Sequence, residues 1–193
     1  MQGNKVIYGP FDEQPAGASA PASVRFEFTK PVLHVASLER DVEVSHWGGN
    51  VAFEERYDLR HRGANLSTEF SRVKWQKSQF TNPVTYALKS LRFPLAPGSA
   101  DLYYTDAIGN VSTSNARSSK REVLLETRPR YPVFGGWKYP FTIGWNTDAE
   151  RSLRRTESGG YVLNVPFLEG PKQAEGIEYA EVTLQILLPE GAE

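Results

Sequence analysis

Three histidines are the first candidates for chemistry in this sequence, because imidazole binds metals and exchanges protons near neutral pH. His34, His46 and His61 are far apart, and none lies in an HExxH motif or another compact ligand spacing. A metal site would have to be assembled across separate strands, and we favour the interpretation that there is none. The sequence also lacks a Gly-x-Ser-x-Gly string, a Walker A loop and a dinucleotide fingerprint. We therefore predict no catalytic residue, no cofactor and no metal.

Three carboxylates recur at every second position in Glu39, Asp41 and Glu43. This spacing would place them on one face of a strand, where a pair of carboxylates could serve glycoside hydrolysis. The alternative is a solvated outer face of a sheet, which needs no further partner. We favour the outer face.

Tryptophans could stack on sugar rings, because an indole offers a flat apolar face and one hydrogen-bond donor. The candidates are Trp47, Trp75, Trp137 and Trp145. We expect most of them to fill the core, and we take Trp47 and Trp137 as the candidate interaction surface.

Two asparagines fit the glycosylation pattern Asn-x-Ser/Thr: Asn65 and Asn110. Asn82 is excluded because Pro83 follows it. Asn110 comes after a stretch typical of an exposed reversal, residues 106–109, whereas Asn65 directly follows an expected strand and precedes an aromatic-rich segment. We predict glycosylation at Asn110, and less complete glycosylation at Asn65.

The composition indicates a folded domain with a balanced charge. Hydrophobic residues make up 39% of the 193 positions and charged residues 23%, which is a globular balance. The 22 basic and 23 acidic side chains nearly cancel, so we expect neither nucleic acid nor an anionic membrane as a partner. Cysteine is absent, which excludes disulfides and thiolate metal sites. We find no apolar run of about 18 residues and no signal-peptide pattern, so we expect no membrane contact by this chain and regard it as an excised piece.

Alternation of apolar and polar residues predicts an all-β fold. Residues 42–44 and 51–59 alternate with period two, and the residues between them, 46–50, contain adjacent glycines suited to a tight reversal. Further strands are expected at 84–93, 101–104, 122–127, 139–145, 161–167 and 179–188. We predict an antiparallel β-sandwich with at most one or two short helices.

Two local patterns refine this fold. The apolar alternation of residues 182–188 suits an antiparallel strand with one solvated side. The capping-box spacing of residues 147–150 predicts a short helix over 151–155. Residues 1–22, rich in proline and small residues, are expected to form an extended lead-in, and residues 23–193 one sandwich domain.

Several strings taken together resemble the ribophorin I family. They are YGPF (8–11), LERDVEVSHWGGNVAFEERYDLRHRGA (38–64), FSR (70–72), DAIGNVSTS (106–114), RPRYPVFGGWK (128–138) and LPEGA (188–192). The strings keep their order and are spread over nearly the whole chain, so together they are much more specific than a short motif.

The resemblance implies a part of the luminal region of a single-pass endoplasmic-reticulum membrane protein, a subunit of the oligosaccharyltransferase that supports N-glycosylation. Residues 23–193 would be its second luminal β-sandwich domain, truncated at the C-terminus and without the transmembrane segment. The implied partners are the other subunits, including the catalytic one, together with nascent acceptor polypeptide. The family also implies that catalysis belongs to a different subunit.

Three functions compete at this stage. The first is a non-catalytic scaffold or interaction domain, which we favour. The second is a module that binds carbohydrate or acceptor peptide through exposed tryptophans such as Trp47 and Trp137. The third is an enzyme related to aminopeptidases, which lacks support because no metal-ligand motif occurs in the sequence.

Overall fold

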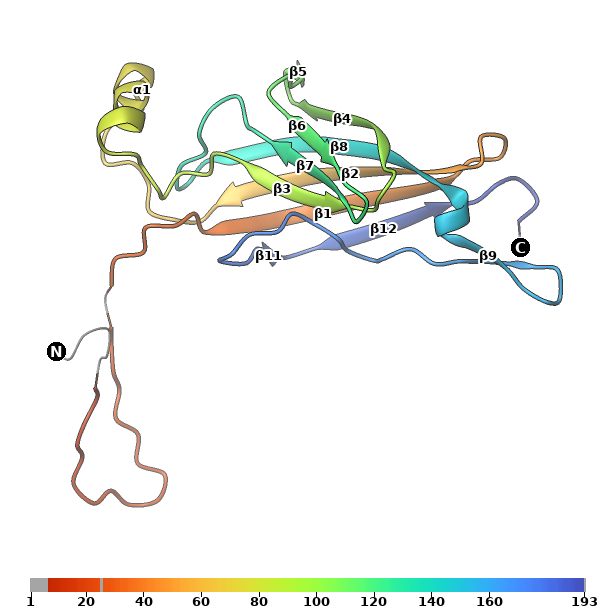
Figure 1. Cartoon of the computed structure of the whole chain (residues 1–193). Helices are drawn as coiled ribbons and strands as arrows, with labels where there is room; N and C mark the ends of the chain where they lie inside the picture. The colour runs from red at the N-terminus through yellow and green to blue at the C-terminus, as the bar shows by residue number, and fades with distance from the viewer. Residues whose placement is uncertain (1–6, 25, 193) are drawn as a thin grey trace.

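Three long strands form the centre of a seven-stranded sheet, as the computed structural model of residues 7–24 and 26–192 describes it (Figure 1). They are β1 (Leu33–Val44), β2 (Asn50–His61) and β8 (Lys138–Asp148). The other elements are α1 (Arg72–Thr81), β3 (Leu91–Leu95), β4 (Ala100–Asp106), β5 (Gly109–Asn110), β6 (Asn115–Ser118), β7 (Val123–Thr127), the 3₁₀ helix η1 (Ala149–Arg151), β9 (Leu153–Arg155), β10 (Tyr161–Leu163), β11 (Glu178–Tyr179) and β12 (Val182–Leu187).

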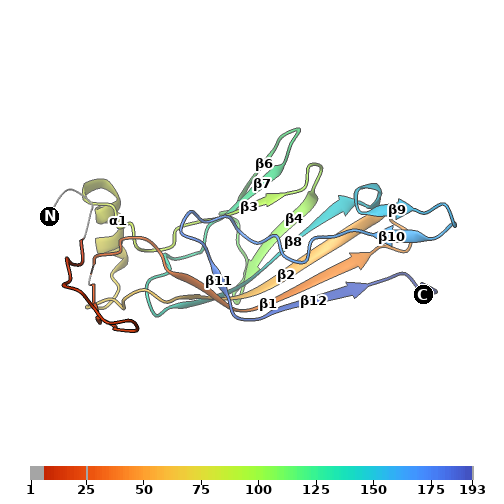
Figure 2. The same cartoon turned by 90° about the horizontal axis from the view of Figure 1, so that it is seen from below.

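The strands form two layers and one additional hairpin. The large sheet has the order β11-β1-β2-β8-β4-β5, and β12 also pairs with β1. A three-stranded sheet, β3-β7-β6, covers one face of the large sheet, and β9 and β10 form a separate pair near the end of β8 (Figures 1 and 2). The all-β sandwich predicted from the alternation is confirmed.

The β1–β2 reversal lies where the adjacent glycines predict it. The backbone N–H of Ser45 donates to the carbonyl oxygen of Asn50 at 2.9 Å, which closes the turn. Gly49 has a φ of +65°, a conformation that a residue with a side chain adopts only with strain. Gly49 therefore supplies the positive φ that the sequence predicts for at least one of the two glycines.

One hydrophobic core lies between the two sheets. Inward side chains of β2 and β8 stack in pairs: Tyr57 on Phe141 with ring centroids 4.8 Å apart, and Phe53 on Trp145 at 5.2 Å. Phe93 of the small sheet meets Tyr57 edge-on at 5.9 Å. Such aromatic pairs add stability beyond the area they bury, so the two layers are locked together at this point.

The antiparallel orientation expected for the last strand is wrong. Strands β11 and β12 both run parallel to β1, with Leu38 opposite Val182 and Glu43 opposite Leu187. A parallel neighbour needs a long connection, and residues 164–177 supply it; Lys172 of this segment donates its backbone N–H to Arg92 of β3, and Glu169 accepts from Arg40 of β1. Period-two alternation reports which face is buried but not the direction of the strand, so the sequence pattern could not distinguish the two orientations.

The number of helices agrees with the prediction, but their positions do not. Helix α1 was not expected; it begins after Ser71, whose Oγ accepts from the backbone N–H of Lys74, and it ends one residue before the Asn82-Pro83 pair. The helix expected over 151–155 is only the 3₁₀ turn Ala149–Arg151, capped by Asp148, because β9 begins at Leu153.

Two expected strands are shorter than their apolar runs. The strand expected at 84–93 overlaps only β3, which runs from Leu91 to Leu95, and of the strand expected at 161–167 only Tyr161–Leu163 joins a ladder. Leu88 forms an isolated bridge with Val133 instead of joining a ladder. No helix in the described part of the chain is long and apolar enough to cross a membrane.

Candidate functional site

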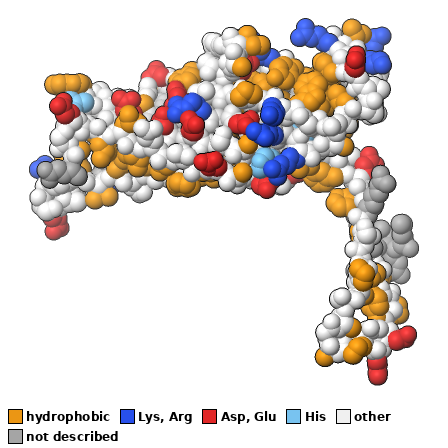
Figure 3. Space-filling view, turned by 180° about the vertical axis from the view of Figure 1, so that it is seen from behind, with side chains coloured by type: hydrophobic (Ala, Val, Ile, Leu, Met, Phe, Trp, Pro, Cys, Tyr) orange, Lys and Arg blue, Asp and Glu red, His pale blue; other side chains and the backbone are white. Residues whose placement is uncertain are grey.

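The outer face of the large sheet, opposite the small sheet, carries a charged cluster around Arg56. Its guanidinium donates to Glu39 at 3.1 Å and to Asp41 at 2.8 Å, and it also pairs with Glu54. These hydrogen bonds, led by the one that Arg56 donates to Asp41, raise the pKa of Arg56. Charged side chains of both signs gather on the face seen in Figure 3. The carboxylates at alternate positions of β1 therefore lie on a solvated face, where Glu39 and Asp41 are counter-ions of Arg56.

A shallow hollow of about 310 Å³ opens beside this cluster. Its walls include Asp41, Glu54, Asp101 and Tyr103. The Tyr103 ring covers Gly144 so closely that a Cβ there would clash with it, and its hydroxyl donates to Glu54. Burial and this bond raise the pKa of Tyr103. The hollow is thus acidic and suited to polar or cationic groups.

The buried histidines have separate structural partners. His34 lies between Glu178 and Arg62. Its Nδ1 is 2.9 Å from a carboxylate oxygen of Glu178, and its Nε2 is 2.9 Å from a guanidinium nitrogen of Arg62. His61 contacts the carbonyl oxygen of Tyr86 at 2.7 Å. Within residues 7–24 and 26–192, no three His, Cys, Asp or Glu side chains are grouped so that they could hold a metal ion.

Trp47 is the most accessible of the tryptophans. It is 92% exposed at the tip of the β1–β2 reversal, next to His46, whose ring centroid is 4.9 Å away. Trp145, in contrast, is buried, and Trp75 and Trp137 are half-buried. Trp47 therefore keeps the exposure that a binding platform needs.

Trp137 lies at the other end of the sheet, so the two candidate tryptophans are not brought together. It immediately precedes β8, which runs antiparallel to β2, so Lys138 pairs with Arg60 at the end of the sheet far from Trp47. The Trp137 ring packs edge-on against Phe70 at 5.6 Å and Phe134 at 5.4 Å. A single sugar platform made of both rings does not exist in this fold.

A buried ion pair, which sequence reasoning missed, joins β1 to β2. Arg40 and Glu55 lie directly opposite each other on the core face, both fully buried, and Arg40 donates to Glu55. The Tyr57 hydroxyl donates to the second oxygen of Glu55 at 2.5 Å. Burial raises the pKa of Glu55, opposed by Arg40 and by the Tyr57 bond. The sequence signal was a pair of opposite charges at inward positions of neighbouring strands.

Arg40 also holds the crossover segment in place. Its second terminal nitrogen donates to Glu169 at 2.8 Å, and its guanidinium lies over the rings of Phe53 and Trp145, 5.1 Å and 5.7 Å from their centroids. Glu169 belongs to residues 164–177, which connect β10 to the parallel strand β11. The network thus stabilises the route that makes the parallel pairing possible.

Asn110 is exposed and lies in β5, the strand that directly follows the turn of residues 107–108. Asp106 accepts from the backbone N–H groups of Ile108 and Gly109 at 3.0 Å and 3.1 Å, and Arg130 donates to its carboxylate at 2.6 Å. Burial acts to raise the pKa of Asp106, but these bonds outweigh it and lower the pKa. The turn therefore holds Asn110 in an accessible position by interactions that do not use its side chain.

Asn65 is also exposed, but in a tighter setting. It bridges to Gly135 through its backbone, and its side chain lies so close to Gly136 that a Cβ there would clash with it. The two asparagines therefore differ in packing rather than in exposure.

Comparison with known proteins gives one family over the whole chain. The sequence model of Ribophorin I matches residues 1–193. The chain is 36% identical over 190 residues to the dolichyl-diphosphooligosaccharide–protein glycosyltransferase subunit 1B of Oryza sativa subsp. japonica, covering 98% of this chain and 39% of that protein. It is 37% identical over 186 residues to subunit 1 of Caenorhabditis elegans, covering 96% and 31%. The chain thus spans well under half the length of these relatives.

Among solved structures, the leukotriene A4 hydrolase of Saccharomyces cerevisiae aligns with 67% of this chain and 18% of its own. The identity is 10% and the TM-score 0.39. That likeness is too weak to carry an argument about fold or function.

Proposed function

This chain belongs to the ribophorin I family, and from that premise we propose that it is a non-catalytic luminal scaffold domain of the oligosaccharyltransferase complex, which N-glycosylates proteins in the endoplasmic reticulum. Its partners are the other subunits, including the catalytic one. The observation that carries the proposal is the match of the family to all residues of the chain, together with relatives named as subunits of that glycosyltransferase.

The build of the domain supports a scaffold. Two buried titratable side chains have partners within the fold: His34 contacts Glu178 and Arg62, and Glu55 pairs with Arg40. Two sheets share one core, which gives a rigid body with large outer faces. A rigid body of this kind can hold neighbouring subunits at a fixed separation.

The scaffold role is tested by replacing the subunit in cells. After depletion of the endogenous subunit, the full-length protein is re-expressed with or without residues 33–187, and both the recovery of the complex and the glycosylation of a reporter are measured. We expect the deletion to lower both together. Normal assembly with normal glycosylation would contradict the proposal.

A second candidate function is binding of carbohydrate or acceptor peptide, and the exposure of Trp47 favours it. An exposed indole next to an imidazole offers a flat surface for a sugar ring or a peptide side chain. Calorimetry of the chain with high-mannose glycan and with peptides that contain Asn-x-Thr tests this role. Binding that Trp47→Ala abolishes would support it, and the absence of heat with either ligand would exclude it.

A further inference from the structure

Helix α1 has no buried side chain, although it forms a regular helix of 10 residues. A helix of this length is marginal on its own in water, and most helices gain their stability by burying one face. It is attached to the body by the half-buried Trp75, whose ring meets Phe134 edge-on at 5.5 Å, and by Lys89, which donates to Gln79 at 2.9 Å and lies over the Trp75 ring. The helix therefore buries little surface, although Ser71 and Pro83 define its two ends clearly.

Large apolar side chains surround α1 and remain exposed. On the helix, Phe80 is 92% exposed and Val73 62%; on the segment that precedes β1, Phe26 is 74% exposed and Phe28 50%. Tyr86 shares one hollow with Trp75 and another with Phe26 and Phe28. We call Phe26, Phe28, Trp75 and Tyr86 the α1 surface; Val73 and Phe80 lie on the opposite side of the helix. Contiguous apolar exposure of this kind marks interaction sites.

The α1 surface is hollowed in two places. One hollow, of about 170 Å³, lies between Trp75 and Tyr86, and the other, of about 440 Å³, is lined by Phe26, Phe28 and Tyr86. Leu66 and Tyr86 border both, so the two hollows adjoin. Hollows of this size can accept the side chains of an extended segment.

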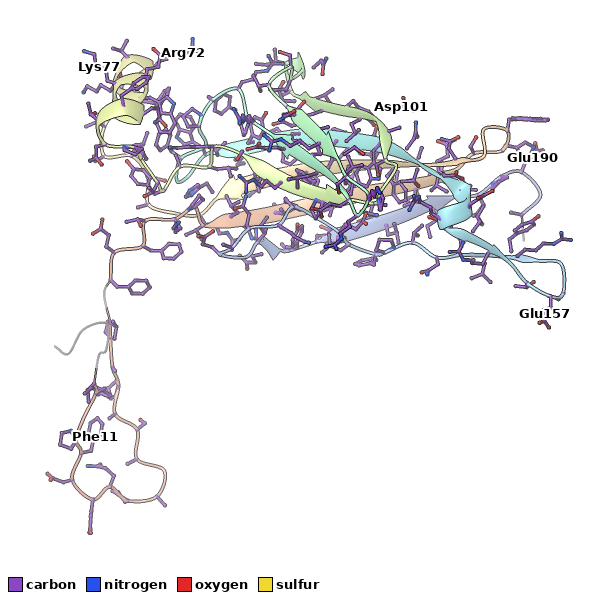
Figure 4. All side chains as sticks on the ribbon, viewed as in Figure 1. Phe11, Arg72, Lys77, Asp101, Glu157 and Glu190 are labelled. Carbon is purple, nitrogen blue, oxygen red and sulfur yellow. The ribbon has the colours of Figure 1, made fainter. Side chains whose placement is uncertain are left out.

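The same region carries an excess of positive charge. Residues 69–92 contain one carboxylate, Glu69, which lines the smaller hollow, and five cations: Arg72, Lys74, Lys77, Lys89 and Arg92. In the described part of the chain none of the five forms an ion pair, although the chain as a whole has a net charge of −1. Arg72 and Lys77 point away from the body (Figure 4). A partner that complements this surface carries negative charge.

We propose that the α1 surface is a docking site for an acidic polypeptide segment that carries apolar side chains, supplied by a protein partner. The apolar side chains fill the two hollows, and the carboxylates pair with the cations of α1. The inference rests on the scaffold role proposed above and names the surface and partner chemistry through which that role is exercised.

The geometry favours a polypeptide over a lipid surface. A helix that lies on a membrane collects its apolar side chains on one face. On α1, Val73 and Phe80 share one side, and Trp75 lies on the opposite side against the body. The adjoining hollows also receive side chains, whereas a bilayer surface has none to insert.

The test uses the chain and a short peptide that alternates Glu with Leu and Phe. A peptide with Lys in place of Glu and vesicles of phosphatidylcholine and phosphatidylserine are the comparison ligands. We expect binding of the acidic peptide alone, with slower hydrogen exchange in α1. Binding of the Lys peptide with equal affinity, or binding of the vesicles but not of the acidic peptide, would overturn the proposal.

Matched variants locate the binding. The triple reversal of Arg72, Lys74 and Lys77 to Glu is expected to weaken binding at least about tenfold. Its control is the same reversal of three exposed cations of the β6–β7 hairpin, Arg117, Lys120 and Arg121. Tyr86→Ser, which changes a 40% exposed side chain that lines both hollows, keeps the test valid if the triple variant unfolds α1. Equal weakening by the control reversal would refute the assignment.

A photo-crosslinker at Tyr86 of the full-length protein in the assembled complex separates this inference from the proposed function, because Tyr86 lines both hollows. We expect a cross-link to an acidic stretch of another subunit. If the protein is present in the complex but Tyr86 cross-links only lipid, a second copy or nothing, the inference fails and the scaffold role stands. If the protein is absent from the complex, the scaffold role itself fails.

Discussion

Replacing Arg40 by Met should destabilise the domain more than any other loss of a single ion pair. The substitution leaves the Glu55 carboxylate fully buried, and the Tyr57 hydroxyl is then its one remaining hydrogen-bond partner among the residues that the structure describes. Removing one member of a buried pair costs roughly 3–5 kcal/mol, out of a total stability of about 5–15 kcal/mol for a domain. Urea unfolding followed by tryptophan fluorescence measures the change, with a constant denaturant slope as the sign that the two states are comparable.

Two further variants decide whether burial is the cause. Arg56 pairs with three carboxylates but its side chain is 39% exposed, so Arg56→Met should cost at most about 1 kcal/mol. The double variant Arg40→Met/Glu55→Leu removes both buried charges and should recover most of the lost stability. Equal costs for the two arginine variants, or a double variant as unstable as Arg40→Met, would refute the reasoning.

The pH dependence of the free energy of unfolding tests the same prediction independently. Burial raises the pKa of Glu55 above 4.5, and Arg40 is the strongest influence that opposes this rise. Without Arg40 the native-state pKa rises further. A carboxyl group whose pKa is higher in the native than in the unfolded state contributes to stability fully when the pH is below the unfolded pKa. That contribution to stability is lost as the pH rises through the native pKa. The stability gap between wild type and Arg40→Met should therefore widen from acidic to neutral pH; a constant gap would contradict the argument.

Three shorter predictions follow from the loops and the tryptophans. Gly49→Val should lower stability by more than about 1 kcal/mol in thermal unfolding, because φ is +65° there; an unchanged melting temperature would contradict the turn. Trp145→Ala should cost about 3–5 kcal/mol and Trp47→Ala almost nothing, since one ring is buried and the other exposed; similar costs in denaturant unfolding would be incompatible with these positions. In a secretory host, Asn110 should carry glycan more completely than Asn65, and the unglycosylated domain should still fold. Peptide mapping after deglycosylation measures this, and modification of Asn65 alone would contradict the predicted order.

The alternation of apolar and polar residues predicted the strands that have one buried and one solvated face. It failed for elements that are buried on both faces or on neither. Strands β2 and β8 alternate between core and solvent, so their sequences carry the pattern. Helix α1 has no buried face and hence no helical period, although Ser71 and Pro83 marked its ends. The direction of β12 depends on the path of residues 164–177, which local patterns do not encode.

The candidate site was predictable only in its local parts. The exposure of Trp47 follows from its place in a tight reversal, which the adjacent glycines predict. Trp137 is partly covered because Phe70 and Phe134, distant from each other in sequence, converge on it. Arg40 interrupts the apolar alternation of β1, and its partner could be identified only once the register of β1 and β2 was known.

A subunit-resolved map of the assembled oligosaccharyltransferase tests the central claim most directly, because it shows both what this domain touches and what lies at the catalytic centre. The account predicts that residues 33–187 pack against other subunits and contribute no side chain to the centre where glycan is transferred. A map in which this domain touches no other subunit, or supplies a side chain to the transfer site, would contradict it.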